Sequence, residues 1–252
     1  MSDVRMPQRR GGMVLPALLT LVGLVVLIGL GLWQLERRAA KHELTAKLAE
    51  RLSGPPAPLP PRAGWDKLDK AQQEYRRVTF PAEFEHEREA LVYAAASAFR
   101  PDVSGPGYWV FTPARLPGGS VVVVNRGFVP DGRQDPKSRP EGQATGIVDL
   151  TGVMRWPEPR GSFTPADAPD RNLWFLRDHQ AIAEQKGWGP VAPFYIEQEA
   201  PAVPGGLPKA GRLQVNLPDN HLQYAITWFS LAGALLVVFI MWMRARRREP
   251  LG

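Results

Sequence analysis

Residues 13–33 read MVLPALLTLVGLVVLIGLGLW, and this stretch decides the architecture of the chain. It contains no charged residue, and Thr20 is its only clearly polar side chain. At about 1.5 Å per residue, a helix of this length reaches roughly 30 Å, which is the thickness of a bilayer core. Pro16 lies near its start, where a helix tolerates proline. The stretch therefore predicts a transmembrane helix.

A cleaved signal peptide is the alternative interpretation, because a basic tail, residues 1–12, precedes the stretch. However, the apolar run is longer than the hydrophobic region of a typical signal peptide, and no convincing cleavage site of small residues follows it. The chain continues directly into the polar segment 34–38, which reads QLERR. We therefore expect the helix to be retained as an anchor.

A second apolar stretch, residues 221–243, reads HLQYAITWFSLAGALLVVFIMWM. Its centre has no proline, and Trp228 and Trp242 lie towards its two ends, as aromatic residues at membrane interfaces do. Four arginines in the tail 244–252 follow it directly. The sequence thus predicts a second transmembrane helix over 221–243.

The net charge of +6 is concentrated in the two tails. Three arginines oppose one aspartate in residues 1–12, and four arginines oppose one glutamate in residues 244–252. The pI near 9.8 therefore reports the tails and does not indicate a nucleic-acid-binding face. Positive tails favour the cytoplasmic side, although Arg37, Arg38 and Lys41 oppose this assignment. We expect both termini to be cytoplasmic and residues 34–220 to be extracytoplasmic.

The segment between the spans divides into a helix, a linker and a β-rich domain. Leu44, Leu48 and Leu52 recur at every fourth position, which predicts an amphipathic helix over 34–52 that continues the first span. A Pro-rich linker then extends to residue 61. Residues 62–220 are typical of a β-rich α+β domain, with strands expected at 78–84, 90–99, 108–115, 121–125, 147–156, 193–197 and 212–217, and a short candidate at 172–176.

Several local features sharpen this expectation. The unbroken valine run 121–124 indicates a strand that is buried on both faces. Asp178 is placed to cap a short helix over 179–186 that ends at Gly187. The glutamates around the predicted turn at 86–89 are expected to form a solvated surface; they are Glu83, Glu85, Glu87 and Glu89.

No catalytic or metal-binding motif is present in the sequence. It contains no Cys, which excludes a disulfide scaffold and thiolate metal sites. No nucleotide-binding glycine motif or serine-nucleophile motif occurs, and the histidines have no metal-ligand spacing; they are His42, His86, His179 and His221. A membrane-anchored enzyme is therefore the least supported class, and we expect no enzymatic activity.

His221 differs from the other histidines because it lies at the outer edge of the second span. On a helix, Tyr224 and Trp228 share its face, and Trp33 and Gln34 end the first span on the same side of the membrane. A neutral imidazole is a good ligand for haem iron, and flat aromatic rings suit a porphyrin. The candidates for contacting haem propionates are Arg37, Arg38 and Arg212. The spacing leaves two interpretations open: a haem site, or side chains that only mark the membrane interface.

Four blocks of the sequence resemble those of the surfeit locus protein 1 family, the cytochrome c oxidase assembly factors. They are LGLWQLERR at 30–38, VNRGFVP at 124–130, PGG at 204–206 and NHLQYAITWF at 220–229. The block at 204–206 reads as a turn. In the block at 124–130, Gly127 permits a sharp exit from a buried strand, and Arg126 is expected to pair with a buried carboxylate.

This resemblance implies a membrane protein with two transmembrane helices flanking an extracytoplasmic β-rich domain. It implies a role in maturing the haem–copper oxidase by holding haem a or passing it to subunit I. His221 is then the tentative ligand of the haem iron, and the other candidate haem-binding residues are Tyr224, Trp228, Trp33 and Gln34. Trp33 and Gln34 also fit a role as interfacial anchors.

The resemblance also implies partners and a location. Candidate partners are cytochrome c oxidase subunit I, haem a synthase and membrane lipid, without nucleic acid. Only twelve residues precede the first span, which is short for a mitochondrial presequence, so we expect a bacterial inner membrane. The alternative function is a membrane scaffold that stabilises an oxidase subunit I intermediate without binding haem.

Overall fold

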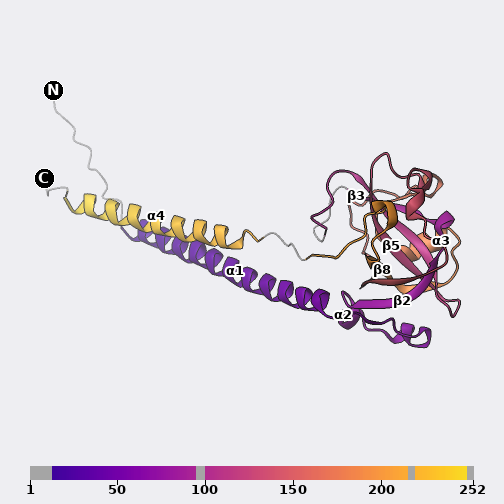
Figure 1. Cartoon of the computed structure of the whole chain (residues 1–252). Helices are drawn as coiled ribbons and strands as arrows, with labels where there is room; N and C mark the ends of the chain where they lie inside the picture. The colour runs from indigo at the N-terminus through magenta and orange to yellow at the C-terminus, as the bar shows by residue number, and fades with distance from the viewer. Residues whose placement is uncertain (1–12, 95–99, 215–218, 249–252) are drawn as a thin grey trace, which may run out of the picture. The chain divides into compact units, whose positions relative to one another are not determined.

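The computed structural model describes residues 13–94, 100–214 and 219–248, and it divides into two units (Figure 1). The first unit comprises residues 1–44 and 218–252, and the second comprises residues 45–217. Each unit is held together by contacts among its own residues.

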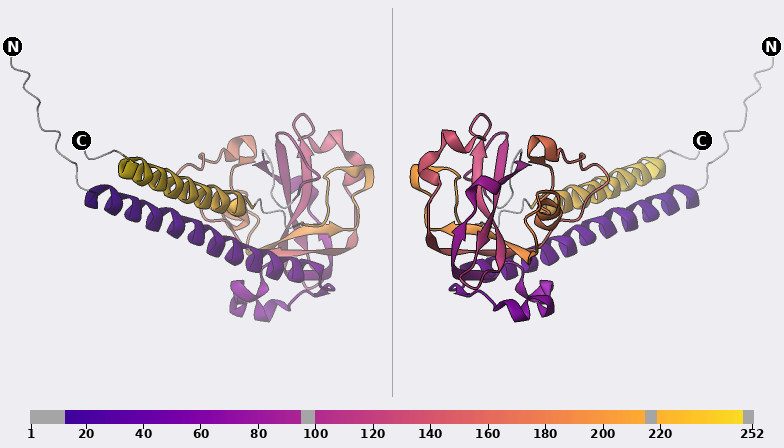
Figure 2. Two further views of the ribbon diagram at one scale, coloured as in Figure 1. Left: turned by 90° about the vertical axis from the view of Figure 1, so that its left-hand side faces the viewer. Right: turned by 90° about the vertical axis from the view of Figure 1, so that its right-hand side faces the viewer.

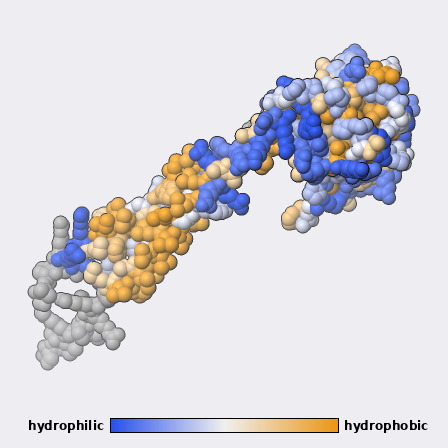
Figure 3. All heavy atoms as spheres, turned by 90° about the horizontal axis from the view of Figure 1, so that it is seen from below, coloured by the Kyte–Doolittle hydropathy of each residue, from blue (hydrophilic) through white to orange (hydrophobic). Residues whose placement is uncertain are grey.

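The first unit is a pair of helices, α1 (Val14–Ser53) and α4 (His221–Arg248), which lie side by side in both Figures 1 and 2. Both helices are long and apolar enough to cross a membrane. Leu15, Val25 and Val238 remain 63–64% exposed, and Figure 3 shows an apolar surface along the pair. Both apolar stretches therefore form the helices that the sequence predicts.

Small residues let the two helices approach each other. Ala225 and Ala232 of α4 are buried, and Gly31 of α1 faces the ring of Phe229. A Cβ atom added to Gly31 would lie 2.5 Å from Cε1 of that ring, which is closer than atoms can approach. Such close contacts are typical of helix pairs in membranes, where packing replaces the hydrophobic effect as the source of association.

The last turns of α1 belong to the second unit. Leu48 and Leu52 are buried there, and Leu52 packs with Val153 and Leu213. The amphipathic helix predicted over 34–52 is therefore confirmed, and it is continuous with the first apolar helix.

The second unit is built around a small barrel. Going round it, the strands are β2 (Arg77–Phe84), β6 (Ile147–Arg155), β8 (Val191–Ala200), β5 (Val121–Pro130) and β4 (Gly107–Arg115). Each strand pairs with the next, and β4 pairs with β2 to close the ring. The β5–β8 pair is parallel and the other pairs in the ring are antiparallel.

Shorter elements complete this unit. The remaining strands are β1 (Ala57–Pro58) beside β2, and β3 (Ala90–Ala94) and β7 (Leu173–Trp174) beyond β4. The α-helices are α2 (Lys70–Gln73) and α3 (His179–Gln185). The 3-10 helices are η1 (Arg62–Lys67), η2 (His86–Arg88), η3 (Pro136–Ser138), η4 (Pro140–Gly142), η5 (Pro169–Arg171) and η6 (Pro204–Gly206).

Strand β5 divides the hydrophobic core into two layers. Val122 and Val124 pack into a cluster with residues of β2, β6 and β8 inside the barrel. Val123 points the other way, into a cluster that includes Trp109 and Ile182 of α3. The prediction that the valine run is buried on both faces is therefore confirmed. Asp178 also caps α3 as predicted, because its carboxylate accepts the backbone N–H groups of residues 180 and 181.

Two expectations about strands are wrong. Strand β5 does not end at Asn125 but continues to Pro130, so Gly127 does not provide an exit from the strand. Gly127 has a φ of +124°, and a Cβ atom there would lie 2.3 Å from the carbonyl carbon of Lys209. Glycine is required because the backbone of Lys209 pairs closely beside β5 here, in an antiparallel bridge that exchanges two hydrogen bonds with Phe128.

The strand expected at 212–217 is likewise not formed at 212–214, and the rest of that segment lies outside the described residues. The end of the strand expected at 90–99 also falls outside them, since β3 is described only to Ala94. The remaining predicted strands are present, with boundaries that shift by a few residues.

Candidate functional site

A direct hydrogen bond joins two of the candidate residues at one end of the helix pair. Nδ1 of His221, the first residue of α4, lies 2.8 Å from Oε1 of Gln34 on α1. Both side chains are partly buried. The blocks at 30–38 and 220–229 therefore meet through their polar residues, although they are separated by most of the sequence.

This bond selects one tautomer of the imidazole. Because Oε1 of Gln34 can only accept, Nδ1 of His221 carries the proton and donates it, which leaves the lone pair on Nε2. Among the described residues, none forms a hydrogen bond with Nε2 of His221. A histidine whose other ring N–H is held by an acceptor is in the state in which imidazole binds a metal.

Asp219 connects the same end of α4 to the next two turns of α1. Its Oδ1 accepts the backbone N–H of His221 at 3.0 Å. Its Oδ2 lies 2.7 Å from Nε2 of His42 and 3.4 Å from Nε of Arg38. The hydrogen bond from His42 is the main cause that lowers the pKa of Asp219 below its usual range. Asp219 therefore ties the start of α4 to α1.

Two of the three aromatic candidates, Trp33 and Tyr224, are more exposed than Gln34 and His221. Trp33 is 47% exposed, and the guanidinium of Arg37 lies 5.6 Å from the centre of its ring. Tyr224 is 55% exposed, whereas Trp228 is partly buried. Arg212 is an exposed residue of the second unit. Of these candidates, Gln34 is the one whose side chain bonds to the imidazole of His221 within the described residues.

Sequence reasoning missed the role of Asp219 and assigned no structural role to His42. The available signal was the spacing of Gln34, Arg38 and His42, which recur at every fourth position and so lie on one face of α1. This face points at the start of α4, because its side chains contact Asp219 and His221.

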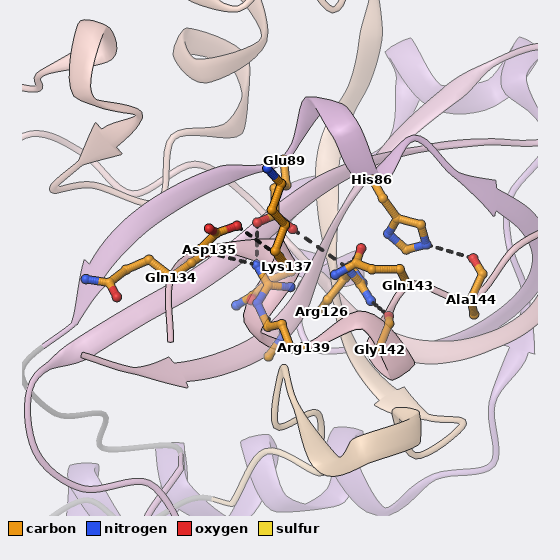
Figure 4. A network of polar contacts seen from close by, with 12 residues as sticks. His86, Glu89, Arg126, Gln134, Asp135, Lys137, Arg139, Gly142, Gln143 and Ala144 are labelled. Atoms are coloured by element: carbon orange, nitrogen blue, oxygen red, sulfur yellow. Dashed lines mark hydrogen bonds and ion pairs between the residues drawn. The ribbon is translucent and has the colours of Figure 1, made fainter. Parts of the chain in front are cut away.

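A second polar cluster, in the barrel unit, is formed by Glu89, Arg126 and Arg139 and is called here the Glu89 cluster (Figure 4). Oε1 of Glu89 accepts a short hydrogen bond from Arg139, and Oε2 lies 3.9 Å from Nη1 of Arg126. The expectation that Arg126 pairs with a buried carboxylate is therefore confirmed. The expectation that Glu89 is solvated is wrong, since Glu89 is only 4% exposed.

The other glutamates near this turn do not all point into water either. Glu85 is partly buried and forms ion pairs with Arg88 and Arg115. These arginines hold the pKa of Glu85 below its usual range, against the opposing effect of burial. Glu83 and Glu87 are exposed as expected. Of the four glutamates in this run, Glu89 is therefore buried and Glu85 is held in ion pairs, while the other two are exposed.

The Glu89 cluster also joins two sequence blocks. Arg126 donates a short hydrogen bond to the carbonyl oxygen of Gly142. Gly142 in turn packs on Leu207, directly after the block at 204–206, so closely that a Cβ atom would lie 2.1 Å from its carbonyl oxygen. The turn predicted at 204–206 is confirmed as η6, with Gly205 against Glu141. No group of three or more His, Asp or Glu side chains suited to a metal ion occurs within the described ranges.

Comparison with known proteins gives a consistent result. The model of the SURF1 family matches residues 21–233. A SURF1-like protein from Monosiga brevicollis is 36% identical over 98% of this chain and 93% of its own length. The Surfeit locus protein 1 of Rattus norvegicus is 34% identical over 88% of this chain and 73% of its own, and that of Homo sapiens is 36% identical over 83% and 71%. With two of its sequence blocks meeting at His221 and the other two at the Glu89 cluster, this chain belongs to the SURF1 family.

Proposed function

We propose that this chain is a membrane-anchored assembly factor for the haem–copper cytochrome c oxidase, which binds haem a through His221 and assists its insertion into subunit I. Membership of the SURF1 family, known for cytochrome c oxidase assembly, supports the assembly role. Subunit I is the principal proposed partner, and haem a synthase is the proposed source of the haem. The protein acts by binding and release rather than by catalysis.

The hydrogen bond between Gln34 and His221 is the observation that carries the haem proposal. It fixes the proton on Nδ1, so Nε2 can donate its lone pair to haem iron without a competing bond from the described residues. A bound haem would supply the iron and the porphyrin face, and the chain would hold it with the imidazole of His221 and the aromatic side chains of the helix pair. Trp33, Tyr224 and Trp228 are the proposed contacts of the porphyrin.

The length and apolar surface of α1 and α4 support this placement. The exposed apolar side chains of both helices would be costly in water and suit lipid, and charged residues begin where each apolar stretch ends. The proposed location is a bacterial inner membrane, with the barrel unit in the periplasm and both basic tails in the cytoplasm. Reporter fusions test this topology: a phosphatase fused after Leu150 should be active and one fused after Gly252 inactive, and the reverse pattern would refute it.

The decisive test is the absorbance spectrum of the full chain purified from cells that make haem a. We expect a Soret band that is lost or shifted in His221→Ala, while the variant still accumulates in the membrane. His42→Ala is the matched control, because it removes an imidazole from the same polar end without removing the proposed ligand. An unchanged spectrum in His221→Ala would show that His221 is not the ligand.

A scaffold that stabilises subunit I without binding haem is the alternative, and one observation favours it. Asp219, Gln34 and their partners join α1 to α4, which is sufficient reason for these polar residues in a purely structural role. A scaffold would be colourless yet would co-purify with subunit I. Under this alternative, His221→Ala would reduce recovery of subunit I with no haem signal to lose.

A further inference from the structure

Two consecutive arginines follow the first apolar stretch of α1, and the structure uses them differently. Arg38 is partly buried, and its Nε lies 3.4 Å from Oδ2 of Asp219. Arg37 is exposed, and its guanidinium lies 5.6 Å from the centre of the Trp33 ring. Within the described residues, the side chain of Arg37 forms neither an ion pair nor a hydrogen bond. One arginine is therefore committed to the start of α4, whereas the other is open to a ligand.

The ring of Trp33 restrains the guanidinium of Arg37 without consuming its donors. The two residues are four apart, so they are neighbours on the surface of α1. The electron-rich face of an indole attracts a cation within about 6 Å, but it does not replace a carboxylate as a hydrogen-bond acceptor. An arginine that is already restrained loses less conformational entropy when it binds a ligand. Its N–H groups remain available for a carboxylate, which can accept two of them in parallel.

Arg37 also lies beside the residue that supports the proposed iron ligand. It follows Gln34 by three residues, and Cβ atoms at this spacing on a helix are about 5–6 Å apart. Oε1 of Gln34 in turn lies 2.8 Å from Nδ1 of His221. Arg37 is the first basic residue after the uncharged stretch 13–33. A porphyrin that packs its apolar face on the end of that stretch would therefore direct its carboxylates towards Arg37.

No carboxylate of the described residues competes for Arg37. Glu36 is its neighbour in the sequence and is exposed, but consecutive residues on a helix do not face each other, and the two form no ion pair within the described part of the chain. Asp219 is already engaged by Arg38, by His42 and by the backbone N–H of His221. The positive charge of Arg37 is thus left for an anion from outside the chain.

We propose that Arg37, restrained by the ring of Trp33, binds a propionate carboxylate of the haem, and that Trp33 is a positioning residue for this contact. The contact gives the site a preference for porphyrins whose carboxylates are free, to which Arg38 does not contribute because Asp219 holds it. This inference rests on the proposed function, since it concerns the same haem site. A lipid phosphate is the other anion that an exposed arginine could meet, and the experiment separates the two sources.

The experiment uses the full chain in phosphatidylcholine nanodiscs, with two probes that differ only in charge. They are iron protoporphyrin IX and its dimethyl ester, in which both carboxylates are esterified. Absorbance titration in the Soret region measures both affinities, with empty nanodiscs as the blank. Arg37→Gln and Arg38→Gln are a matched pair, because each removes one guanidinium from adjacent positions. The ratio of the two affinities is the decisive quantity, since a change that only loosens the helix pair weakens both probes alike.

We expect the unchanged protein to bind iron protoporphyrin IX about threefold to fivefold more tightly than the ester, the value of an exposed ion pair. Arg37→Gln should abolish this preference by weakening the binding of the free acid alone, whereas Arg38→Gln should keep it. Trp33→Leu should reduce the preference as well. Trp228→Leu is its control, because Trp228 holds no cation among the described residues, and it should lower both affinities by the same factor.

The outcomes separate this inference from the haem proposal. If the unchanged protein binds both probes equally, or if Arg37→Gln leaves their ratio unchanged, Arg37 does not bind a propionate, while haem binding through His221 still stands. An unchanged ratio in Arg37→Gln is also the result expected if Arg37 meets a lipid phosphate. If neither probe binds to the unchanged protein, both proposals are overturned.

Discussion

The Gln34–His221 site and the Glu89 cluster each bring two distant sequence blocks together, but they use polar side chains in opposite ways. Gln34 and His221 are partly buried, make one bond to each other and leave Nε2 of the imidazole open. Glu89 and Arg126 are almost fully buried within the packing of the barrel unit. Burial therefore separates the polar residues that contribute to folding from those that water or a ligand can still reach.

The difference follows from the cost of leaving a charge unpaired. In the barrel unit, an arginine that loses its carboxylate cannot turn to water, so the whole cost falls on folding. At the end of the helix pair, water can replace a lost partner, so the fold tolerates the change. Substitutions in the two clusters should therefore separate stability from ligand binding.

The largest effect is expected for Glu89→Gln. The substitution leaves Arg126 and Arg139 buried without a carboxylate, which should lower the free energy of unfolding by about 3–5 kcal/mol. Urea unfolding of the full chain in nanodiscs, followed by tryptophan fluorescence, measures it. Glu87→Gln is the matched control, because Glu87 is exposed two residues away, and it should change stability by less than about 0.5 kcal/mol. Equal effects of the two variants would contradict a structural role for the cluster.

A somewhat smaller loss of stability is expected when the pH is lowered, and it arises in the barrel unit. Burial lowers the pKa of His179 to about 4, and its ring packs in the core and bonds to the backbone of Ala192. Because the folded pKa lies below the unfolded value, the unfolded state binds the proton first. Stability is therefore full above pH 6.5 and falls as the pH drops towards 4, by roughly 3 kcal/mol in total.

His86 adds to this loss in the same direction, since its pKa is also about 4, but its side chain is more exposed and its share is smaller. Unfolding midpoints measured between pH 7 and pH 4 test the prediction. His179→Gln should flatten the pH dependence even though the variant starts from a lower stability. A midpoint that is constant from pH 6.5 to pH 4 would show that neither imidazole is held neutral by the fold.

At the helix pair, Gln34→Leu should change haem binding and leave folding intact. Loss of the acceptor on Nδ1 frees the imidazole to adopt either tautomer, and loss of such a supporting bond typically weakens metal binding about 10–100-fold. Absorbance titration of the full chain with haem measures the affinity. Gln34→Glu should restore binding, because a carboxylate also accepts the Nδ1 proton. Equal affinity of Gln34→Leu and the unchanged protein would remove Gln34 from the proposed site.

Hydrophobic patterns in the sequence predicted most helices and strands, because such an element is set largely by residues that are close in the sequence. The valines at 121–124 form a strand buried on both sides, and the leucines at 48 and 52 form the buried face of a helix, whereas Leu44 is 52% exposed. Gly127 was misjudged because its requirement is not local: the backbone of Lys209, distant in the sequence, packs against β5 at this point. The closure of the sheet between β2 and β4 has no sequence signal for the same reason.

The residues of the candidate sites show the same difference between features set locally and features set by distant partners. His221 and Gln34 were identified from their positions at the ends of apolar stretches, which the sequence shows directly. Glu89 was misjudged, because alternation around a turn resembles a solvated surface unless the two arginines that enclose it, from β5 and from the loop before η4, are known. Asp219 was missed since its partners lie on the other helix.

The smallest effect on haem affinity is expected for Asp219→Asn. This substitution tests whether Asp219, like Gln34 and His221, lies where water can replace a lost partner. The amide can still accept the backbone N–H of His221, so the start of α4 should keep its geometry, while the carboxylate's hydrogen bond with His42 and its ion pair with Arg38 are lost. Both pairs are solvent-exposed, so water replaces them at little cost. Haem affinity should therefore fall less than in Gln34→Leu, and the difference from the unchanged protein should shrink further in 0.5 M salt, which screens such pairs over a few ångströms.

Because the pKa of Asp219 is lowered in the folded protein, its contribution should be constant at neutral pH and disappear only as the pH falls through that lowered value. An effect as large as that of Gln34→Leu, or one that salt does not reduce, would mean that Asp219 acts on His221 as a buried partner, and the contrast with the Glu89 cluster would fail at this residue.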